Sequence, residues 1–291
     1  MPSPPLACTV RGCGLPLTRH DRTWTCPSRH AYDVARRGYV NLLQPQDRRS
    51  PEAGDARAAI EARAGLLAAG VGRAILDAMA ARAAALPLSD EPVVVELGSG
   101  GGDLLAALAR LRPIAGIGLD LSVAAAEHAA RRHAGLTWVV ANADRRLPLL
   151  DGRVDLVLSM HARRNPAECG RVLAPGGHLL VAVPAEDDLI ELRALVQGQG
   201  VPRDRTEALV AEHHPHFRLI DRETVRERRT LGRSELVELL RGTYRGRRHS
   251  VAARVGALDR LEVTLASDLC LFAPAPPAQG SSSAAPTSRT S

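Results

Sequence analysis

The chain has 291 residues, of which 45% are hydrophobic and 24% are charged. This balance is typical of a folded protein and excludes wholesale disorder, and the length suits one large domain or two ordinary ones. No stretch approaches the roughly 18 consecutive apolar residues that span a bilayer, and residues 1–12 contain no apolar signal core. We therefore expect a cytoplasmic protein that does not enter a membrane.

All 38 basic residues are arginine, because the chain contains no lysine. The formal net charge of +6 suits an anionic partner, although many proteins without nucleic-acid partners are also basic. The distribution is more informative. Residues 1–50 hold eight arginines and three aspartates, and residues 241–248 hold four arginines and no acid. These two segments predict two separate basic patches.

Composition divides the chain into four segments. Residues 1–45 contain three of the five cysteines and few apolar runs, as expected of a small domain that needs a metal ion or disulfides for stability. In residues 46–90, apolar positions such as Ile60, Val71 and Ile75 recur at helical spacing and predict one or two connecting helices. Residues 91–273 form the main domain. Residues 274–291, rich in Pro, Ala, Ser and Thr, are expected to be a disordered tail.

The main domain alternates between strand and helix patterns. Apolar runs of strand length occupy residues 93–97, 114–119, 136–141, 154–159 and 178–183. Helical patterns cover 104–111 and 123–133, and further helical segments separate the later strands. Regular exchange of this kind predicts a parallel α/β sheet. The residues beyond it are expected to complete the sheet or to form a lid.

Four residues with metal-binding side chains form two close pairs, Cys8 with Cys13 and Cys26 with His30, separated by twelve residues. Two turns that each supply two ligands suit one tetrahedral Zn²⁺. Glycines on both sides of Cys13 allow the backbone to fold under the metal. Because protein ligands fill all four positions, we predict one structural zinc ion. The alternative, a disulfide with unrelated thiols, is disfavoured in a reducing compartment.

The strand at 93–97 leads directly into a glycine-rich turn, Glu96-Leu-Gly98-Ser-Gly100-Gly-Gly102. Such a turn lets a ligand approach the backbone closely. Asp120 ends the second strand, where its carboxylate can accept hydrogen bonds from both hydroxyls of a ribose. A dinucleotide such as NAD(P) is the alternative ligand. However, its turns place the third glycine one residue later, and the acid at Glu96 suits a cationic ammonium better than a phosphate.

This turn resembles the first motif of class I S-adenosylmethionine-dependent methyltransferases. Residues 141–144, Ala-Asn-Ala-Asp, fall where that class wraps the adenine, and residues 173–177, Leu-Ala-Pro-Gly-Gly, match its turn before the fifth strand. The resemblance implies a Rossmann-like class I methyltransferase sheet with S-adenosylmethionine as cofactor. The cofactor-binding residues that it implies are Glu96, Gly98, Gly100, Gly102, Asp120, Asn142 and Ala143.

The cysteine and histidine pairs, the segment from Tyr32 to Leu43, Gly54-Asp55 and Ala62-Arg63 together resemble the RlmA and TlrB group of 23S ribosomal RNA guanine-N1 methyltransferases. The resemblance implies a small N-terminal zinc-binding domain that helps grip an RNA hairpin, next to a cofactor-binding core. It also implies a homodimer with a basic cleft. Some members of the group confer resistance to macrolide-type antibiotics.

The chain departs from that family at three places. Members carry Gly-His-Tyr where this chain has Gly70-Val71-Gly72, and a tyrosine where it has His161. Members also carry a histidine beyond the fifth strand, and in that region this chain has Val-Pro-Arg at residues 201–203. A methyltransferase for another RNA position or a small molecule, or a non-catalytic RNA-binding relative, therefore stays an open alternative.

Guanine N1 carries a proton, so a base or a polarising partner near the fourth strand would assist methyl transfer. The catalytic residues that we predict are His161, the favoured one, and Asn165. Asp155 ranks lowest because it starts its strand, far from the cofactor's edge of the sheet. His161 has the competing interpretation of a surface histidine that starts a loop.

Phosphate neutralisation and base stacking predict an RNA-binding surface beside the zinc. The residues assigned to it are Arg36, Arg37, Tyr39, Arg48 and Arg49. The competing interpretation is the solvated face of a basic protein.

Overall fold

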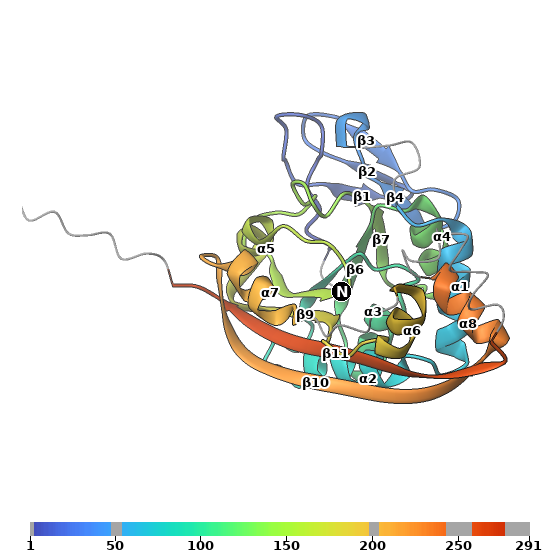
Figure 1. Cartoon of the computed structure of the whole chain (residues 1–291). Coiled ribbons are helices and arrows are strands. Elements are labelled where there is room, and N and C mark those ends of the chain that lie inside the picture. Colours follow the sequence, from blue (N-terminus) through green and yellow to red (C-terminus); the bar gives the residue numbers. More distant parts are fainter. Residues whose placement is uncertain (1–2, 48–53, 198–203, 243–257, 277–291) are drawn as a thin grey trace, which may run out of the picture.

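The computed structural model describes residues 3–47, 54–197, 204–242 and 258–276. An eight-stranded sheet carries helices on its two faces, and a small three-stranded sheet lies above it at one side (Figure 1). Residues 3–47, drawn in blue in Figure 1, are called the N-terminal module below.

The small sheet consists of β1 (Thr18–His20), β2 (Thr23–Thr25) and β3 (Ala31–Asp33). The large sheet consists of β4 (Tyr39–Asn41), β5 (Val93–Leu97), β6 (Ala115–Asp120), β7 (Thr137–Val140), β8 (Val154–Met160), β9 (Leu173–Pro184), β10 (Phe217–Gly232) and β11 (Arg260–Pro274). The helices are α1 (Arg57–Ala68), α2 (Arg73–Ala84), α3 (Asp103–Leu111), α4 (Val123–Arg132), α5 (Pro166–Val172), α6 (Ile190–Gln197), α7 (Thr206–His213) and α8 (Arg233–Arg241), with a 3-10 turn η1 (Pro45–Asp47).

The large sheet has the order β10-β11-β9-β8-β5-β6-β7-β4. Strands β4 to β9 run parallel, while β11 is antiparallel to both β9 and β10. After the edge strand β4, the chain continues at β5 in the centre of the sheet, proceeds outward through β6 and β7, and then crosses to β8 on the other side of β5. Such a reversal opens a crevice at the carboxyl ends of the strands. The predicted parallel α/β sheet is confirmed, and β10 and β11 complete it.

Alternation of side chains along the strands supplies two apolar faces. Val94 packs in one cluster with Leu76 of α2 and Leu104 of α3, whereas Val95 packs in another with Val172 of α5. Adjacent strand residues point to opposite faces, and a strand covered on both faces is apolar throughout. This is why β5 reads as a continuous apolar run up to Glu96.

The N-terminal module is built into the large sheet. Its strand β4 pairs in parallel with β7, with Tyr39 opposite Trp138, and Leu6 forms a bridge with Leu149. The buried Trp24 and Leu42 belong to the same apolar cluster as the strand residues Val95 and Val139. The module therefore shares a core with the main domain, which the sequence pattern does not predict.

The connecting helices α1 and α2 contribute to a further core with α6, α8 and the ends of β10 and β11. Leu66 and Val71 pack there with Leu236 and Val263. No single helix among the described residues is long and apolar enough to cross a membrane; α1 and α2 pass that test only as a pair bent by 85°.

Candidate functional site

The four predicted metal ligands converge within the N-terminal module. Their ligand atoms, the sulfurs of Cys8, Cys13 and Cys26 and a ring nitrogen of His30, all lie within 4.8 Å of one another. Cys13 Sγ is 3.8 Å from Cys26 Sγ, and His30 Nδ1 is 3.4 Å from the sulfurs of Cys8 and Cys26. With Zn–S of about 2.3 Å and Zn–N of about 2.1 Å, tetrahedral ligand atoms lie about 3.5 to 3.8 Å apart. The cluster therefore has the dimensions of a zinc site.

Tight turns position these ligands. Gly12 and Gly14 adopt φ of +77° and +65°, a conformation that a residue with a side chain rarely adopts. The backbone N–H of Leu15 lowers the pKa of the Cys13 thiol to about 7, which favours the thiolate that a metal binds.

Tyr32 is an outer partner of the cluster that sequence reasoning missed. Its oxygen accepts the backbone N–H groups of Thr9 and Val10 at 3.1 and 3.2 Å, and its hydroxyl lies 3.2 Å from both Cys8 Sγ and Thr9 Oγ1. Hydrogen bonds of this kind orient the ligands of a metal. The tyrosine lies two residues after His30 on β3, a spacing that carries no recognised metal signal.

The glycine-rich turn runs from the end of β5 to the start of α3. Glu96 is 2% exposed, and its carboxylate accepts the backbone N–H of Leu105 at 3.3 Å. Burial raises the pKa of Glu96 well above its usual value. This acid therefore ties the first turn of α3 to the strand and lies beneath the turn.

Asp120, at the end of β6, faces the same turn. One carboxylate oxygen accepts the N–H of Gly100 at 2.8 Å, and the other accepts the N–H of Ser122 at 2.7 Å. Burial raises the pKa of Asp120. Because each carboxylate oxygen has two acceptor sites, both oxygens can also accept a hydroxyl from a ligand.

The three glycines of the motif differ in surroundings, although all have positive φ. A Cβ at Gly98 would lie 2.4 Å from Ala162 Cβ, and one at Gly102 would lie 2.3 Å from the Trp138 ring. A Cβ at Gly100 would meet no protein atom within 4 Å. Gly98 and Gly102 are thus required by packing, whereas Gly100 borders open space next to Asp120.

Asn142 and Ala143 follow β7 at this edge of the sheet. Asn142 is 7% exposed, and its side-chain oxygen accepts the N–H of Asp144 at 3.0 Å. This bond fixes the turn in which Ala143 is partly buried. The structure therefore brings the predicted cofactor residues to the carboxyl ends of β5, β6 and β7.

His161 follows β8 at the same edge. It adopts φ of +53°, and its ring Nε2 lies 2.8 Å from Ser267 Oγ of β11. The residue keeps an exposed face, yet desolvation by the surrounding protein, assisted by the charge of Arg205, lowers its pKa to about 4. The imidazole is therefore neutral, and Nδ1 is the nitrogen that Ser267 leaves to a ligand.

Asn165 and Asp155 have structural partners. The side-chain oxygen of Asn165 accepts the N–H groups of Ala167 and Glu168 at 3.1 and 3.4 Å and caps α5, a common function of asparagine. Asp155 accepts the N–H of Val93 at 2.8 Å at the opposite edge of the sheet, in agreement with its low rank.

Comparison with known proteins gives two kinds of match. Residues 7–51 match the model of the RlmA N-terminal zinc ribbon, and residues 94–177 match a methyltransferase domain. The 23S rRNA (guanine(748)-N(1))-methyltransferase of Streptomyces fradiae is 36% identical over 273 residues, which are 91% of this chain and 95% of the relative. A protein of Micromonospora griseorubida assigned as a 23S rRNA (guanine-N(1)-)-methyltransferase is 37% identical over 93% of this chain and 98% of its own length.

The chain belongs to this family of methyltransferases. It is an S-adenosylmethionine-dependent enzyme with a class I methyltransferase fold and an N-terminal zinc-binding region. The site fits that cofactor, because a buried acid supports a glycine turn whose Gly100 borders open space and Asp120 offers two ribose acceptors.

The residues predicted to bind RNA in this methyltransferase fall into three groups. Arg36 and Arg37 are exposed on the turn before β4, and Arg37 Nε lies 3.5 Å from Glu127 of α4. Tyr39 is half-buried against the core that contains Trp138, so its ring also has a packing role. Arg48 and Arg49 lie outside the described residues.

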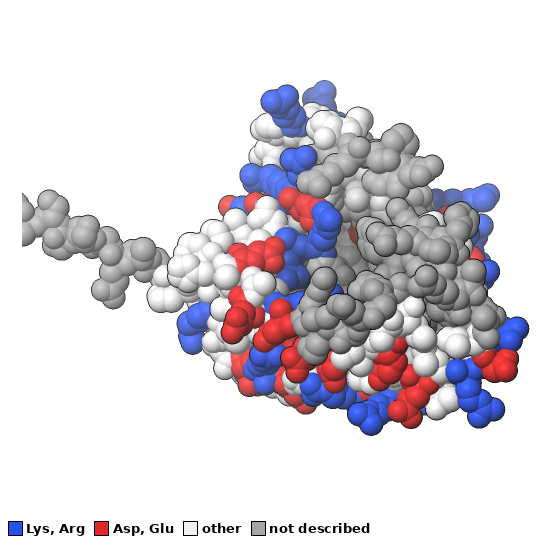
Figure 2. Space-filling view, in the orientation of Figure 1, with Lys and Arg blue, Asp and Glu red and all other residues white. Residues whose placement is uncertain are grey.

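Arginines dominate the visible surface of the module. Figure 2 shows basic side chains at its top and in the hollow at its base, whereas acidic and basic side chains alternate over β10 and β11 below. The exposed arginines of the module are Arg11, Arg19, Arg22, Arg29, Arg36 and Arg37.

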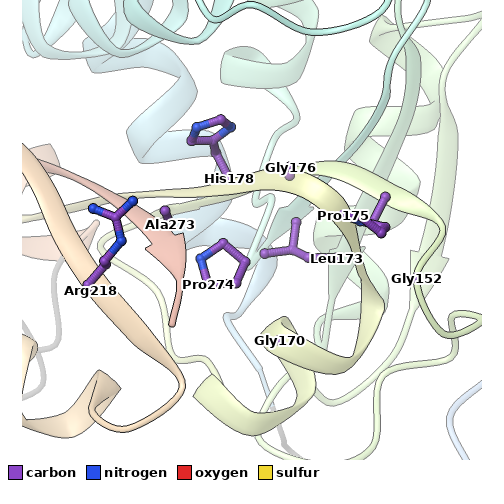
Figure 3. A pocket seen from close by; sticks show the side chains of 11 residues that line it. Gly152, Gly170, Leu173, Pro175, Gly176, His178, Arg218, Ala273 and Pro274 are labelled. Atoms are coloured by element: carbon purple, nitrogen blue, oxygen red, sulfur yellow. The ribbon is translucent and has the colours of Figure 1, made fainter. Parts of the chain in front are cut away.

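A pocket of about 600 Å³ lies away from this edge. Leu173, His178 and Arg218 line it at the amino-terminal ends of β8 and β9 (Figure 3). It includes residues 175–177, which the sequence predicts as a turn before the fifth strand; in the structure they lie within β9, where Gly176 has φ of +80° and the pairing with β8 is irregular. None of the predicted cofactor residues lines it.

Proposed function

We propose that this methyltransferase transfers a methyl group to N1 of a guanine in a 23S rRNA hairpin. The observation that carries the proposal is the position of the N-terminal module. It is attached to the large sheet next to the strand ends that carry the predicted cofactor residues. Strand β4 lies beside β7, and a Cβ at Gly14 would lie 3.9 Å from the guanidinium of Arg146, four residues beyond Asn142. A basic surface that positions RNA thus adjoins the turns that would hold the cofactor.

Zinc is assigned to Cys8, Cys13, Cys26 and His30. The cofactor is assigned to Glu96, Gly98, Gly100, Gly102, Asp120, Asn142 and Ala143. We propose segments 1–45 for RNA recognition, 46–90 as connector, 91–273 for methyl transfer and 274–291 as a tail, of which residues 277–291 lie outside the described chain.

When bound, S-adenosylmethionine supplies a methyl group on a positively charged sulfur. The protein's contribution is to align the accepting nitrogen and to exclude water. In this proposal Asp120 fixes the ribose, the turn at Gly100 approaches the cofactor, and His161 faces the base from the end of β8.

A pKa of about 4 makes His161 a weak base. We therefore assign it a hydrogen bond to the guanine through Nδ1, with Ser267 holding Nε2 at 2.8 Å. The N1 proton leaves to solvent before water is excluded and the methyl group is accepted, because the lone pair of a protonated amide nitrogen is delocalised into the ring. Asn165, which caps α5, would act only by holding the loop that carries His161.

We extend the proposal to a cytoplasmic enzyme that works as a homodimer with a basic cleft, as the family resemblance implies. The exposed arginines of the module, with Arg48 and Arg49, would contact phosphates. This charge-based grip makes RNA affinity depend on salt concentration.

Methyl transfer to a 23S rRNA transcript tests the proposal. Purified protein, zinc and S-adenosylmethionine are incubated with the transcript, and modified guanines are located by reverse transcription, which stops at a methyl group on the base-pairing edge. A stop at one hairpin guanine is expected, with the guanine equivalent to position 748 examined first. Methylation of small aromatic amines or phenols with no stop in the RNA would instead support a small-molecule enzyme.

A further inference from the structure

The motif Gly54-Asp55 and the pair Ala62-Arg63 have no place in the site described so far. The structure brings both against the turn that follows Asp120. Gly54 has φ of +94°, and a Cβ there would lie 2.7 Å from the Cα and N atoms of Ser122. This backbone contact leaves no space for a side chain. Glycine is therefore required at position 54 by both conformation and proximity.

Hydrogen bonds fasten the two segments together. Ser122 Oγ donates to the carbonyl oxygen of Asp55 at 2.7 Å, and Ser122 N donates to the carboxylate of Asp120 at 2.7 Å. One residue, Ser122, thus joins the connector to the proposed ribose acceptor.

Arg63 closes the arrangement from α1. One guanidinium nitrogen forms an ion pair with the carboxylate of Asp55, and another donates to the carbonyl oxygen of Gly242, at the end of α8, at 2.9 Å. Ala62, its neighbour, is 3% exposed and anchors α1 in the core. The fork of an arginine can bond two acceptors at once, which the single ammonium of a lysine does less well.

Electrostatics link the same residues to the cofactor side. Burial raises the pKa of Asp120; of the nearby charges, Asp55 raises it further and Arg63 lowers it. Asp55 and Arg63 are 37% and 40% exposed, and ion pairs at that exposure contribute little to global stability. An effect on the adjacent carboxylate is therefore a better account of the motif than stability alone.

We propose that Gly54, Asp55, Arg63 and Ser122 form a clasp that holds Asp120 in position for the cofactor's ribose. Arg63 is a positioning residue: it acts through Asp55 and Ser122. The clasp rests on the proposed function only in taking Asp120 as the ribose acceptor.

Calorimetric titration with S-adenosylhomocysteine, without RNA, tests the clasp. Arg63→Gln is expected to raise Kd about tenfold, the scale of one charge-assisted hydrogen bond, and Arg63→Lys to restore part of the affinity. The matched control is Arg57→Gln on the same helix, where the arginine pairs with Glu127 at 3.2 Å and is 52% exposed. Its affinity should stay within about twofold of wild type.

A double-mutant cycle with Asp120→Asn separates positioning from general destabilisation. If Arg63 acts through Asp120, adding Arg63→Gln to Asp120→Asn costs little more affinity. Additive losses, or equal losses in Arg57→Gln, would overturn the clasp and leave the cofactor site intact. Wild-type affinity in Asp120→Asn would overturn the site and the clasp together. Gly54→Ala gives an independent test should Arg63→Gln fold poorly: wild-type affinity in that variant would contradict the clasp.

Discussion

The zinc cluster and the glycine turn are two sites built in opposite ways. Four side chains make the first: Cys8 and Cys13 come from the segment before β1, and Cys26 and His30 come from the turn between β2 and β3, strands of three residues each. The second consists mostly of backbone, at the ends of strands buried on both faces. The first needs a metal to hold it, because metal binding in such modules is folding energy. The second is held by the sheet. One chain therefore combines a ligand-dependent element with a self-supporting one.

Removing a zinc ligand should have the largest effect. Cys26→Ser is expected to lower zinc content from one per chain to below half, to unfold the module and to abolish RNA methylation, since structural zinc in finger peptides is worth about 10–16 kcal/mol. Cofactor affinity should stay within a few-fold. Metal analysis and hydrogen exchange measure these effects.

The shared core sharpens this prediction. Because β4 pairs with β7, backbone hydrogen exchange in Cys26→Ser should become faster in β4 and β7 and stay unchanged in β5. Ser28→Ala, an exposed change in the same turn, is the control. Full zinc content in Cys26→Ser would refute the assignment of the cluster.

Changes at the cofactor turn should be smaller and local. Asp120→Ala is expected to weaken S-adenosylmethionine binding by about 1 to 3 kcal/mol, the scale of charge-assisted hydrogen bonds to buried hydroxyls. Gly100→Val should weaken it more, because its side chain would enter space bordered by no protein atom within 4 Å. Calorimetry gives both affinities.

Gly135→Val is the matched control for Gly100→Val. Gly135 also has positive φ, +93°, and its Cβ would also meet nothing within 4 Å, but it lies in the turn before β7. Equal affinity losses in the two variants would indicate backbone strain and contradict cofactor contact at Gly100.

Charge removal on the predicted RNA-binding surface should affect RNA binding alone. Neutralising Arg36, Arg37, Arg48 and Arg49 to Gln is expected to weaken rRNA binding and to reduce the slope of log K against log salt by about 0.7 to 0.9 per lost phosphate contact. Filter binding at several salt concentrations measures the slope. A control of equal charge replaces four exposed arginines outside the module: Arg110, Arg153, Arg218 and Arg228. Equal effects of the two sets of substitutions would indicate that RNA binding depends on the overall positive charge of the protein and not on this surface.

The smallest effect concerns pH. A His161 pKa of about 4 in the folded protein, against about 6.5 unfolded, means that the unfolded chain binds more protons between these values. Stability should therefore fall as pH drops from 6.5 towards 4. His161→Gln should lose less thermal stability than wild type between pH 7.5 and 5. An identical pH dependence of Tm in both proteins would contradict the lowered pKa of His161.

Sequence patterns predicted local features well. The apolar run before Glu96 predicted β5, and the paired spacing of Cys8 to His30 predicted a cluster that the structure assembles. Contacts between distant segments were not predictable. The pairing of β4 with β7 depends on a three-residue strand, and Tyr32 reaches Cys8 across 24 positions.

The glycines illustrate the same limit. The motif predicted that a ligand can approach the backbone closely, but not that a side chain at Gly102 would collide with the ring of Trp138, which comes from another strand. Asn165 has a residue type compatible with catalysis, yet its oxygen caps a helix. Residue type and spacing therefore indicate which chemistry is available, while packing decides how each residue is used.

Mass mapping of methylated guanines in 23S rRNA, from cells with and without this gene, tests the central claim most directly. The account predicts one N1-methylguanine in a hairpin that is present with the gene, absent without it, and lost in both Cys26→Ser and Asp120→Ala. Identical guanine methylation in the two strains would contradict it.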